Sequence, residues 1–177
     1  MDHYGLGGKF IVRDKNFDLD VDKAVYPEYL VYGSFDFPEH DIVLNLAGQS
    51  DLVVKNGNDL FIRDYKTNKK IDTKSFYNRR IRSYETMLFP VSHIMDCNFM
   101  EYSLQLSMYA YMIKRLKPEL NVAGLTLEHY DHSNNMTEYE CDYLEDEVKL
   151  IIEDYAKQLR VQIEKDKNKP VTFFLEW

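Results

Sequence analysis

The sequence LAGQSDLVVKNGNDLFIRDYK, residues 46–66, decides the fold. Two apolar runs of β-forming residues, 52–54 and 60–62, flank Asn56-Gly57-Asn58. An Asn-Gly pair between such runs is the strongest short-range signal of a β-hairpin. The stretch therefore predicts two antiparallel strands that turn near residue 57.

The predicted hairpin brings charged side chains together. Pairing about residue 57 places Asp51 roughly opposite Asp64, and strand alternation points Asp64 and Lys66 to one face and Tyr65 to the other. Two carboxylates and an ammonium on one face are costly unless something compensates for them. A divalent cation would do so, bound by Asp51, Asp64 and a main-chain carbonyl, for which we take that of Tyr65. Mg²⁺ suits so sparse a ligand set because it keeps several waters.

The lysine completes a set of groups suited to one reaction. An ammonium beside the cation could orient or help to deprotonate an attacking water and stabilise charge that develops on a phosphate. These residues therefore predict metal-assisted hydrolysis of a phosphodiester. Gly48, where the first strand meets the site, would let a phosphate approach the backbone closely, or would form a β-bulge.

Three motifs follow one another in a specific order: Gly48-Gln49-Ser50-Asp51, Asp64-Tyr65-Lys66 and Gln105-Leu106-Ser107-Met108-Tyr109. This series resembles the G-x-x-D, D-x-K and Q-x-x-x-Y motifs of the PD-(D/E)XK nuclease superfamily, in its RecB-like exonuclease branch and especially its phage-encoded members. The D-x-K motif alone occurs by chance in many chains. The ordered set is more specific, because it requires strands for the first two motifs and a helix for the third. The match covers roughly residues 42 to 130.

The resemblance implies a fold and an activity. The fold would be α/β, a restriction-endonuclease-like core with a mixed central β-sheet flanked by helices. The activity would be that of a metal-dependent deoxyribonuclease, an exonuclease of DNA recombination, repair or phage DNA metabolism. Asp51 and Asp64 would bind one or two Mg²⁺ or Mn²⁺ ions, and Lys66 would orient the attacking water. Gln105 and Tyr109 would support the lysine or the phosphate.

Two positions of the family's metal site are open in this sequence. An acidic residue in a preceding element often completes the site, and Glu28 is the candidate, with a solvent-facing charge on an edge strand as the alternative reading. RecB-like nucleases usually also carry a His on an upstream helix. Here no convincing helix bears one, since His3 is near the chain start and His40 lies in a predicted loop. A second hypothesis is therefore a weak or inactive nuclease-fold module that binds DNA or a protein, and a third is an RNA-directed nuclease.

The charge distribution bears on nucleic-acid binding. The net charge is -8, which argues against a broadly basic surface, since phosphate affinity rests on Lys and Arg. A local basic strip nevertheless follows the predicted site, and its candidates for DNA contact are Lys69, Lys70, Arg79 and Arg80. The alternative reading of this strip is a solvated loop and helix face.

The third motif lies on a predicted helix over residues 99–116, with Asn98 as its N-cap. Gln105 and Tyr109 share a face of this helix, and an unpaired buried Gln amide would cost about 1 to 3 kcal/mol. The functional reading places Gln105 near the lysine or a phosphate, and the alternative is a core Tyr with a boundary Gln. The buried stripe of the helix would comprise Tyr102, Leu106, Tyr109, Met112, Ile113 and Leu116.

The remaining elements complete a single domain, predicted over residues 1–177 with residues 1–24 poorly defined. Strands are predicted at 25–32, 122–130 and 136–141, and a helix at 145–165 whose apolar face includes Val148, Ile152 and Tyr155. His129 and His132 are poor candidates for ligands of a magnesium site.

The sequence also bears on location and partners. Two distant cysteines indicate neither zinc nor a disulfide framework. With no apolar run long enough for a membrane span and no signal peptide, we expect a cytoplasmic protein. The resemblance implies DNA as its ligand and other recombination or phage proteins as further partners.

Overall fold

The predicted β-hairpin lies at the centre of the sheet. In the computed structural model, which describes residues 11–12 and 19–167, β3 (Ile42–Asn56) and β4 (Asp59–Lys66) pair antiparallel with Val53 opposite Ile62. Gly57 in the turn has a φ of 63°, a left-handed conformation that glycine adopts without the penalty of a Cβ. The local turn chemistry therefore sets the register of the two central strands.

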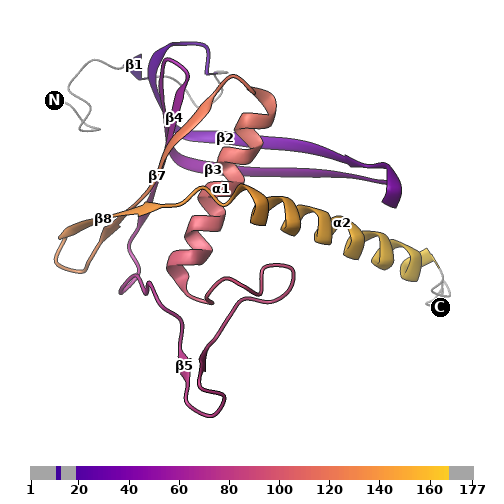
Figure 1. The fold of residues 1–177 in the computed structure, drawn as a ribbon. Helices are drawn as coiled ribbons and strands as arrows, with labels where there is room; N and C mark the ends of the chain where they lie inside the picture. The colour runs from indigo at the N-terminus through magenta and orange to yellow at the C-terminus, as the bar shows by residue number, and fades with distance from the viewer. Residues whose placement is uncertain (1–10, 13–18, 168–177) are drawn as a thin grey trace, which may run out of the picture.

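The hairpin is extended on both sides into a six-stranded sheet of order β1-β2-β3-β4-β7-β8. The added strands are β1 (Ile11–Val12), β2 (Lys23–Phe37), β7 (Asn121–Tyr130) and β8 (Met136–Cys141). The β1–β2 and β4–β7 pairs are parallel and the others are antiparallel, which confirms the predicted mixed sheet. The long β2–β3 hairpin ends at a short 3-10 helix, η1 (Pro38–His40), far out from the rest of the sheet (Figure 1).

Two helices pack against this sheet. The chain passes from β4 through α1 (Asn98–Leu116) to the parallel strand β7, because parallel neighbours need a crossover connection. The second helix, α2 (Glu145–Lys167), follows the edge strand β8 and contacts α1. Among the described residues, no helix is both long and apolar enough to cross a membrane.

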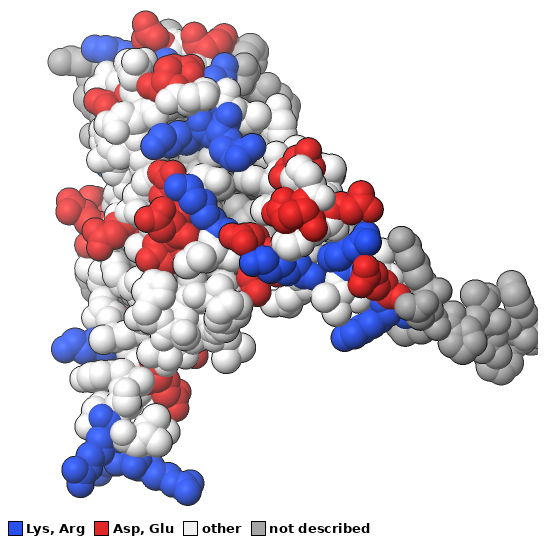
Figure 2. Space-filling model, turned by 45° about the vertical axis from the view of Figure 1, so that its right-hand side comes forward, with Lys and Arg blue, Asp and Glu red and all other residues white. Residues whose placement is uncertain are grey.

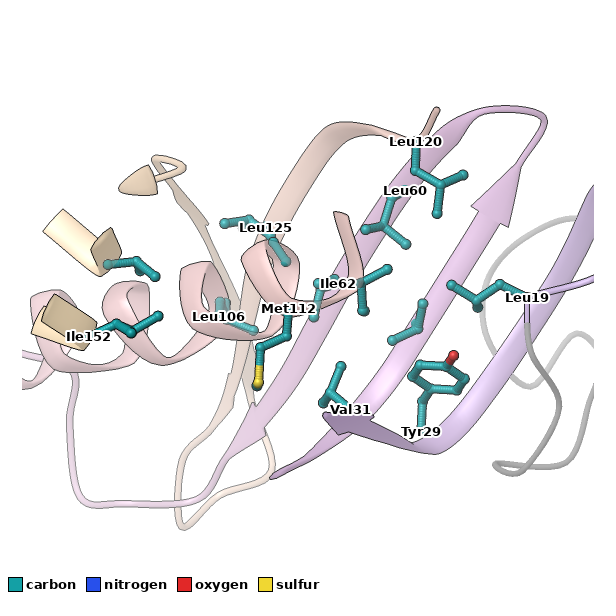
Figure 3. Close-up of a cluster of buried hydrophobic side chains, with 14 of the residues drawn as sticks. Leu19, Tyr29, Val31, Leu60, Ile62, Leu106, Met112, Leu120, Leu125 and Ile152 are labelled. Atoms are coloured by element: carbon teal, nitrogen blue, oxygen red, sulfur yellow. The ribbon is translucent and has the colours of Figure 1, made fainter. Parts of the chain in front are cut away.

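The helices and one face of the sheet share the main hydrophobic core. Leu60, Ile62 and Leu125 of the strands meet Leu106 and Met112 of α1 in this cluster (Figure 3). A smaller cluster contains strand residues alone, namely Val25, Leu52 and Val54 with the partly buried Phe61. The predicted α/β architecture is thus confirmed, with α1 and α2 both contributing to the main core.

Two residues of the predicted apolar stripes lie at the surface. Leu116 is 47% exposed and Tyr155 is 51% exposed, so their predicted burial is wrong. Leu116 is the last residue of α1. On α2 the fully buried positions are Val148, Ile152 and Ala156, a narrow stripe of four-residue spacing that leaves Tyr155 to one side.

The start of α1 also differs from the prediction. Cys97, not Asn98, occupies the N-cap position, without a side-chain cap. The Asn98 side chain instead accepts a hydrogen bond from the Asp72 N–H at 2.7 Å and donates one to the Lys70 carbonyl at 3.1 Å. It therefore fastens the segment that follows β4 to the beginning of α1.

The alternation of side chains changes phase midway along β2 and β3. Tyr26 and Tyr29, three residues apart, both belong to the main core, and so do Leu44 and Val53, nine residues apart. Strict alternation would put the members of each pair on opposite faces. The change in β2 occurs at Glu28, whose φ is 49°. As a result, the part of β3 next to the hairpin turn directs its odd-numbered residues toward the helices.

The structure describes only part of the N-terminal segment predicted at residues 1–24. Apart from Ile11 and Val12, its first 18 residues lie outside the described part of the chain, and His3 lies there too. The single-domain boundary of 1–177 therefore stays a prediction.

Candidate active site

The two aspartates of the hairpin meet where the β3–β4 ladder ends. The paired residues run to Leu52 opposite Arg63, and the next step of this register sets Asp51 opposite Asp64, as predicted. There the Asp51 side chain replaces a ladder bond, because the Tyr65 N–H donates to Asp51 Oδ2 at 2.8 Å. The side chain of Asp51 is thereby held at the end of the hairpin, beside Asp64.

Lys66 connects the aspartates to helix α1. Its Nζ lies 2.6 Å from Asp64 Oδ2 and donates to Gln105 Oε1 at 3.2 Å. The ammonium also lies 4.2 Å from the ring centroid of Tyr102, a geometry that attracts a cation to the ring face. Three side chains from two elements thus fix the position of the ammonium.

The Gln105 amide is satisfied at both ends. Its oxygen accepts from Lys66, and its Nε2 donates to the Tyr109 hydroxyl at 2.9 Å. The helical spacing of four residues places the two side chains one turn apart, in reach of each other. The structure thus brings Gln105 to the lysine, as the functional reading expected, and Tyr109 to Gln105.

Gly48 makes room for the tyrosine. A Cβ on Gly48 would lie 2.8 Å from Tyr109 Cε1, a distance too short for two carbon atoms. The space beside this glycine on the helix side is therefore filled by the Tyr109 ring. Gly48 forms part of a continuous strand, β3, and its role in the described structure is to let β3 and α1 approach closely.

Asp64 lies in an environment that disfavours its charge. The residue is 4% exposed, and this burial is the main reason why its pKa is raised above the ordinary value. The neighbouring Asp51 raises the pKa further, whereas Lys66 lowers it. Asp64 Oδ2 is buried and, although close to the ammonium, has no aligned hydrogen-bond donor among the described residues.

These features fit a divalent cation bound by few protein ligands. A cation would compensate the buried, under-bonded oxygen of Asp64 and the repulsion between the two carboxylates. The Tyr65 carbonyl points toward the same side as its N–H, which is bonded to Asp51, because a strand residue directs both groups to one neighbour. No group of three or more His, Cys, Asp or Glu within the described ranges is placed to hold a metal. Within these ranges, Asp51 and Asp64 are thus not joined by a third side chain of this kind in the present conformation.

Glu28 does not form such a group with the two aspartates. It occupies the register position of β2 opposite Asp51, between the pairs Pro27–Leu52 and Tyr29–Ser50, and its side chain is exposed. The backbone turns at this residue, with the positive φ described above. Glu28 thus lies on the strand next to Asp51, but it is not arranged as a third ligand in this conformation.

His40 lies too far along the hairpin to take the place of the expected upstream histidine. It belongs to η1 at the distal end of β3, whereas Asp51 lies nine residues after Ile42 along the strand. At about 3.3 Å per residue the separation is on the order of 30 Å. Among the described residues that precede β3, no α-helix is present.

The basic strip falls into two separate parts. Lys69 and Lys70 lie in the segment just after β4, where Lys70 forms an exposed ion pair with Asp72 at 2.7 Å. Arg79 and Arg80 lie in the turn of a small, separate hairpin, where Figure 2 shows a basic group at the lower end of the molecule. None of the described residues between β4 and α1 is helical, so the helix face that the alternative reading gave this strip is wrong.

Sequence reasoning missed two neighbours of the lysine. Tyr102 was expected only as a member of the buried stripe, yet its ring contacts the ammonium. Its position three residues before Gln105, on the same helix face, was the available signal. His129 is paired with Lys66 in the β4–β7 register, and its Nε2 lies 2.6 Å from the Asn68 carbonyl. It therefore supports the segment after β4.

Comparisons with known proteins find one matching family and two similar solved structures. A family model described as the PD-(D/E)XK nuclease superfamily matches residues 14–171. The crystal structure of SSO0001 is similar at a TM-score of 0.46 and 14% identity, covering 78% of this chain and 50% of that one. A "putative exonuclease" from Eubacterium rectale is similar at a TM-score of 0.43 and 8% identity, covering 85% and 54%.

The chain thus spans about half the length of these two solved structures. No curated protein matches its sequence. The family model, in contrast, extends over nearly the whole chain and includes all three motifs that meet at the site. The chain belongs to the PD-(D/E)XK nuclease superfamily.

Proposed function

We propose that the chain is a metal-dependent deoxyribonuclease that hydrolyses DNA phosphodiester bonds, of the RecB-like exonuclease type. One observation carries this proposal: a continuous series of contacts links Asp51, Asp64, Lys66, Gln105 and Tyr109 across three elements. A purely structural hairpin would have no reason to gather two carboxylates and an ammonium at a partly buried position.

Each residue has a distinct part in this proposal. Asp51, Asp64 and the Tyr65 carbonyl would hold one or two Mg²⁺ or Mn²⁺ ions, with Glu28 as a further ligand if its exposed side chain turns toward Asp51. The metal, when bound, supplies Lewis-acid activation of water and neutralises charge on the phosphate. Lys66 orients the attacking water and stabilises negative charge on the phosphate oxygens.

Gln105 and Tyr109 act on the reaction through the lysine. The Gln105 oxygen holds the Lys66 ammonium, and the Tyr109 hydroxyl fixes the orientation of the Gln105 amide. The long lysine side chain is thereby restricted to few rotamers before substrate binds, which reduces the entropy lost on reaching the reactive geometry. We regard Gln105 and Tyr109 as positioning residues. The substrate in this proposal is DNA, and recombination or phage proteins are further partners.

A cleavage assay tests the proposed function. Linear, nicked and circular DNA, single- and double-stranded, are incubated with Mg²⁺ or Mn²⁺ beside the variant Asp64→Ala/Lys66→Ala. Glu153→Ala/Lys157→Ala, which removes an exposed ion pair of 2.7 Å on α2, is the matched control. We expect metal-dependent cleavage in wild type and control but not in the site variant, and survival of circles would show that an end is needed. Cleavage that persists in the site variant would contradict the assignment.

A second function is favoured by the sparse metal site. Because no third acidic or histidine ligand joins Asp51 and Asp64 in the described residues, the alternative is a catalytically weak or inactive nuclease-fold module that binds DNA or a protein. Calorimetry separates the two proposals. Absence of both metal binding and cleavage in folded protein would favour the module.

A further inference from the structure

A small hairpin stands apart from the body of the domain. We call residues 76–85 the arm: it contains β5 (Tyr77–Asn78), a turn and β6 (Ser83–Tyr84), which form their own two-stranded sheet. The Glu85 N–H donates to the Phe76 carbonyl at 2.9 Å and closes the base of the arm. In Figure 1 the arm projects from the lower end of the molecule, away from the six-stranded sheet.

The arm exposes an unusual amount of apolar surface for its size. Phe76 is 69% exposed and Ile81 is 65% exposed. Tyr77 and Tyr84 pack edge-to-face at 5.1 Å on one side of the arm, and both remain over a third exposed. An isolated two-stranded hairpin is at best marginally stable in water, so burial of this apolar surface against a ligand would stabilise the arm.

The turn of the arm adds positive charge without compensation. Arg79, Arg80 and Arg82 are exposed, and the turn and both strands of the arm contain no Asp or Glu, whereas Glu85 lies exposed at the base. Among the described residues, the ion pairs of arginine are those of Arg63 and Arg160. On the face that Figure 2 shows, the basic group at the lower end of the molecule is not interrupted by an acidic residue. In a chain of net charge -8, the turn of the arm is therefore a local positively charged surface.

Exposed aromatic rings together with unpaired arginines match one class of ligand. A single nucleic-acid strand offers phosphates to the arginines and unstacked base faces to the rings. A duplex offers phosphates, but its base faces are covered by stacking. We propose that the arm binds single-stranded DNA, with Phe76 as a stacking platform, which deepens and rests on the nuclease function proposed above.

The base of the arm is tied to the candidate active site. The segment that leads to the arm begins directly after Lys66, and nine residues lie between Lys66 and Phe76, so the two residues are at most about 35 Å apart. The Asn98 side chain fastens this segment at residues 70 and 72 to the start of α1. The same helix holds Lys66 through Gln105. The point where the arm would bind a strand is thus within this distance of Lys66.

Binding measured without metal tests this inference independently of cleavage. Fluorescence anisotropy in EDTA compares labelled oligo(dT) with a blunt duplex of equal length, using wild type, Phe76→Ala and Phe76→Trp. Tyr32→Ala is the matched control, because Tyr32 is a 63% exposed aromatic residue on β2. We expect Phe76→Ala to weaken binding of the single strand by about 5- to 100-fold, the loss of one stacked base, and to leave duplex binding unchanged.

Two control variants show whether the ring of Phe76 itself is responsible for binding of the single strand. Phe76→Trp, which keeps a ring for stacking, should restore single-strand affinity, and Tyr32→Ala should bind as wild type does. Equal affinity of Phe76→Ala and wild type for oligo(dT), or an equal loss in Tyr32→Ala, would overturn the inference. Since EDTA prevents metal-dependent cleavage, an inactive protein that still shows the Phe76 effect would contradict the nuclease proposal alone.

Discussion

At the scale of single residues, Asp64 combines a buried carboxylate with a nearby like charge. Its pKa is raised, mainly by burial and also by Asp51, so the folded state binds a proton here more tightly than the unfolded chain does. Stability therefore falls as pH rises from the ordinary Asp pKa of about 4 to the raised value, and stays constant above it. Without a bound cation, the buried charge of Asp64 therefore lowers the stability of the folded protein at neutral pH.

We expect Asp64→Asn to remove this pH dependence. The neutral amide keeps the shape of the side chain, so without metal the variant should be at least as stable as wild type near pH 7, while cleavage should fall by at least about 100-fold. Melting temperatures in EDTA across the acidic range, with Asp59→Asn as a control on the same strand, provide the measurement. A wild type whose melting temperature rises through this window relative to Asp64→Asn would contradict the argument.

At the scale of elements, the contact between β3 and α1 depends on one glycine. A Cβ at Gly48 would lie 2.8 Å from the Tyr109 ring, and overpacking of this kind typically costs about 1 to 3 kcal/mol. We expect Gly48→Ala to destabilise the domain and to lower cleavage, because a displaced Tyr109 no longer holds the Gln105 amide.

A double-mutant cycle separates this clash from other effects of the substitution. Tyr109→Ala removes the ring that the new methyl group would meet, so Gly48→Ala should cost much less in that background. Urea unfolding of the four proteins gives the coupling free energy. Additive losses would show that Gly48 is required by β3 alone.

At the scale of the whole molecule, metal binding should be visible as stability. A ligand that binds only the folded state stabilises it by about 2.7 kcal/mol at a hundred times its Kd. We expect Mn²⁺ or Mg²⁺ to raise the melting temperature of wild type and to have almost no effect on Asp51→Asn. Glu28→Gln should show a smaller loss, since Glu28 is exposed and not grouped with the aspartates. An equal rise in all three proteins would place the metal elsewhere.

The sequence by itself determined the centre of this protein. The Asn-Gly turn and strand alternation specified the register that sets Asp51 opposite Asp64, and helical spacing joined Gln105 to Tyr109. These features follow from turn geometry and from the periods of strand and helix, which act between residues close in the chain. The predicted first and last residues of the strand at 136–141 are likewise those of β8 in the structure.

Only the tertiary structure decided which elements meet and where they leave surface exposed. The approach of α1 to the hairpin put Tyr102 over Lys66 and filled the space at Gly48 with Tyr109. The change of phase at Glu28 and the separation of the arm from the main sheet also have no local signal in the sequence. Such features depend on packing between residues distant in the chain, which propensity and periodicity do not specify.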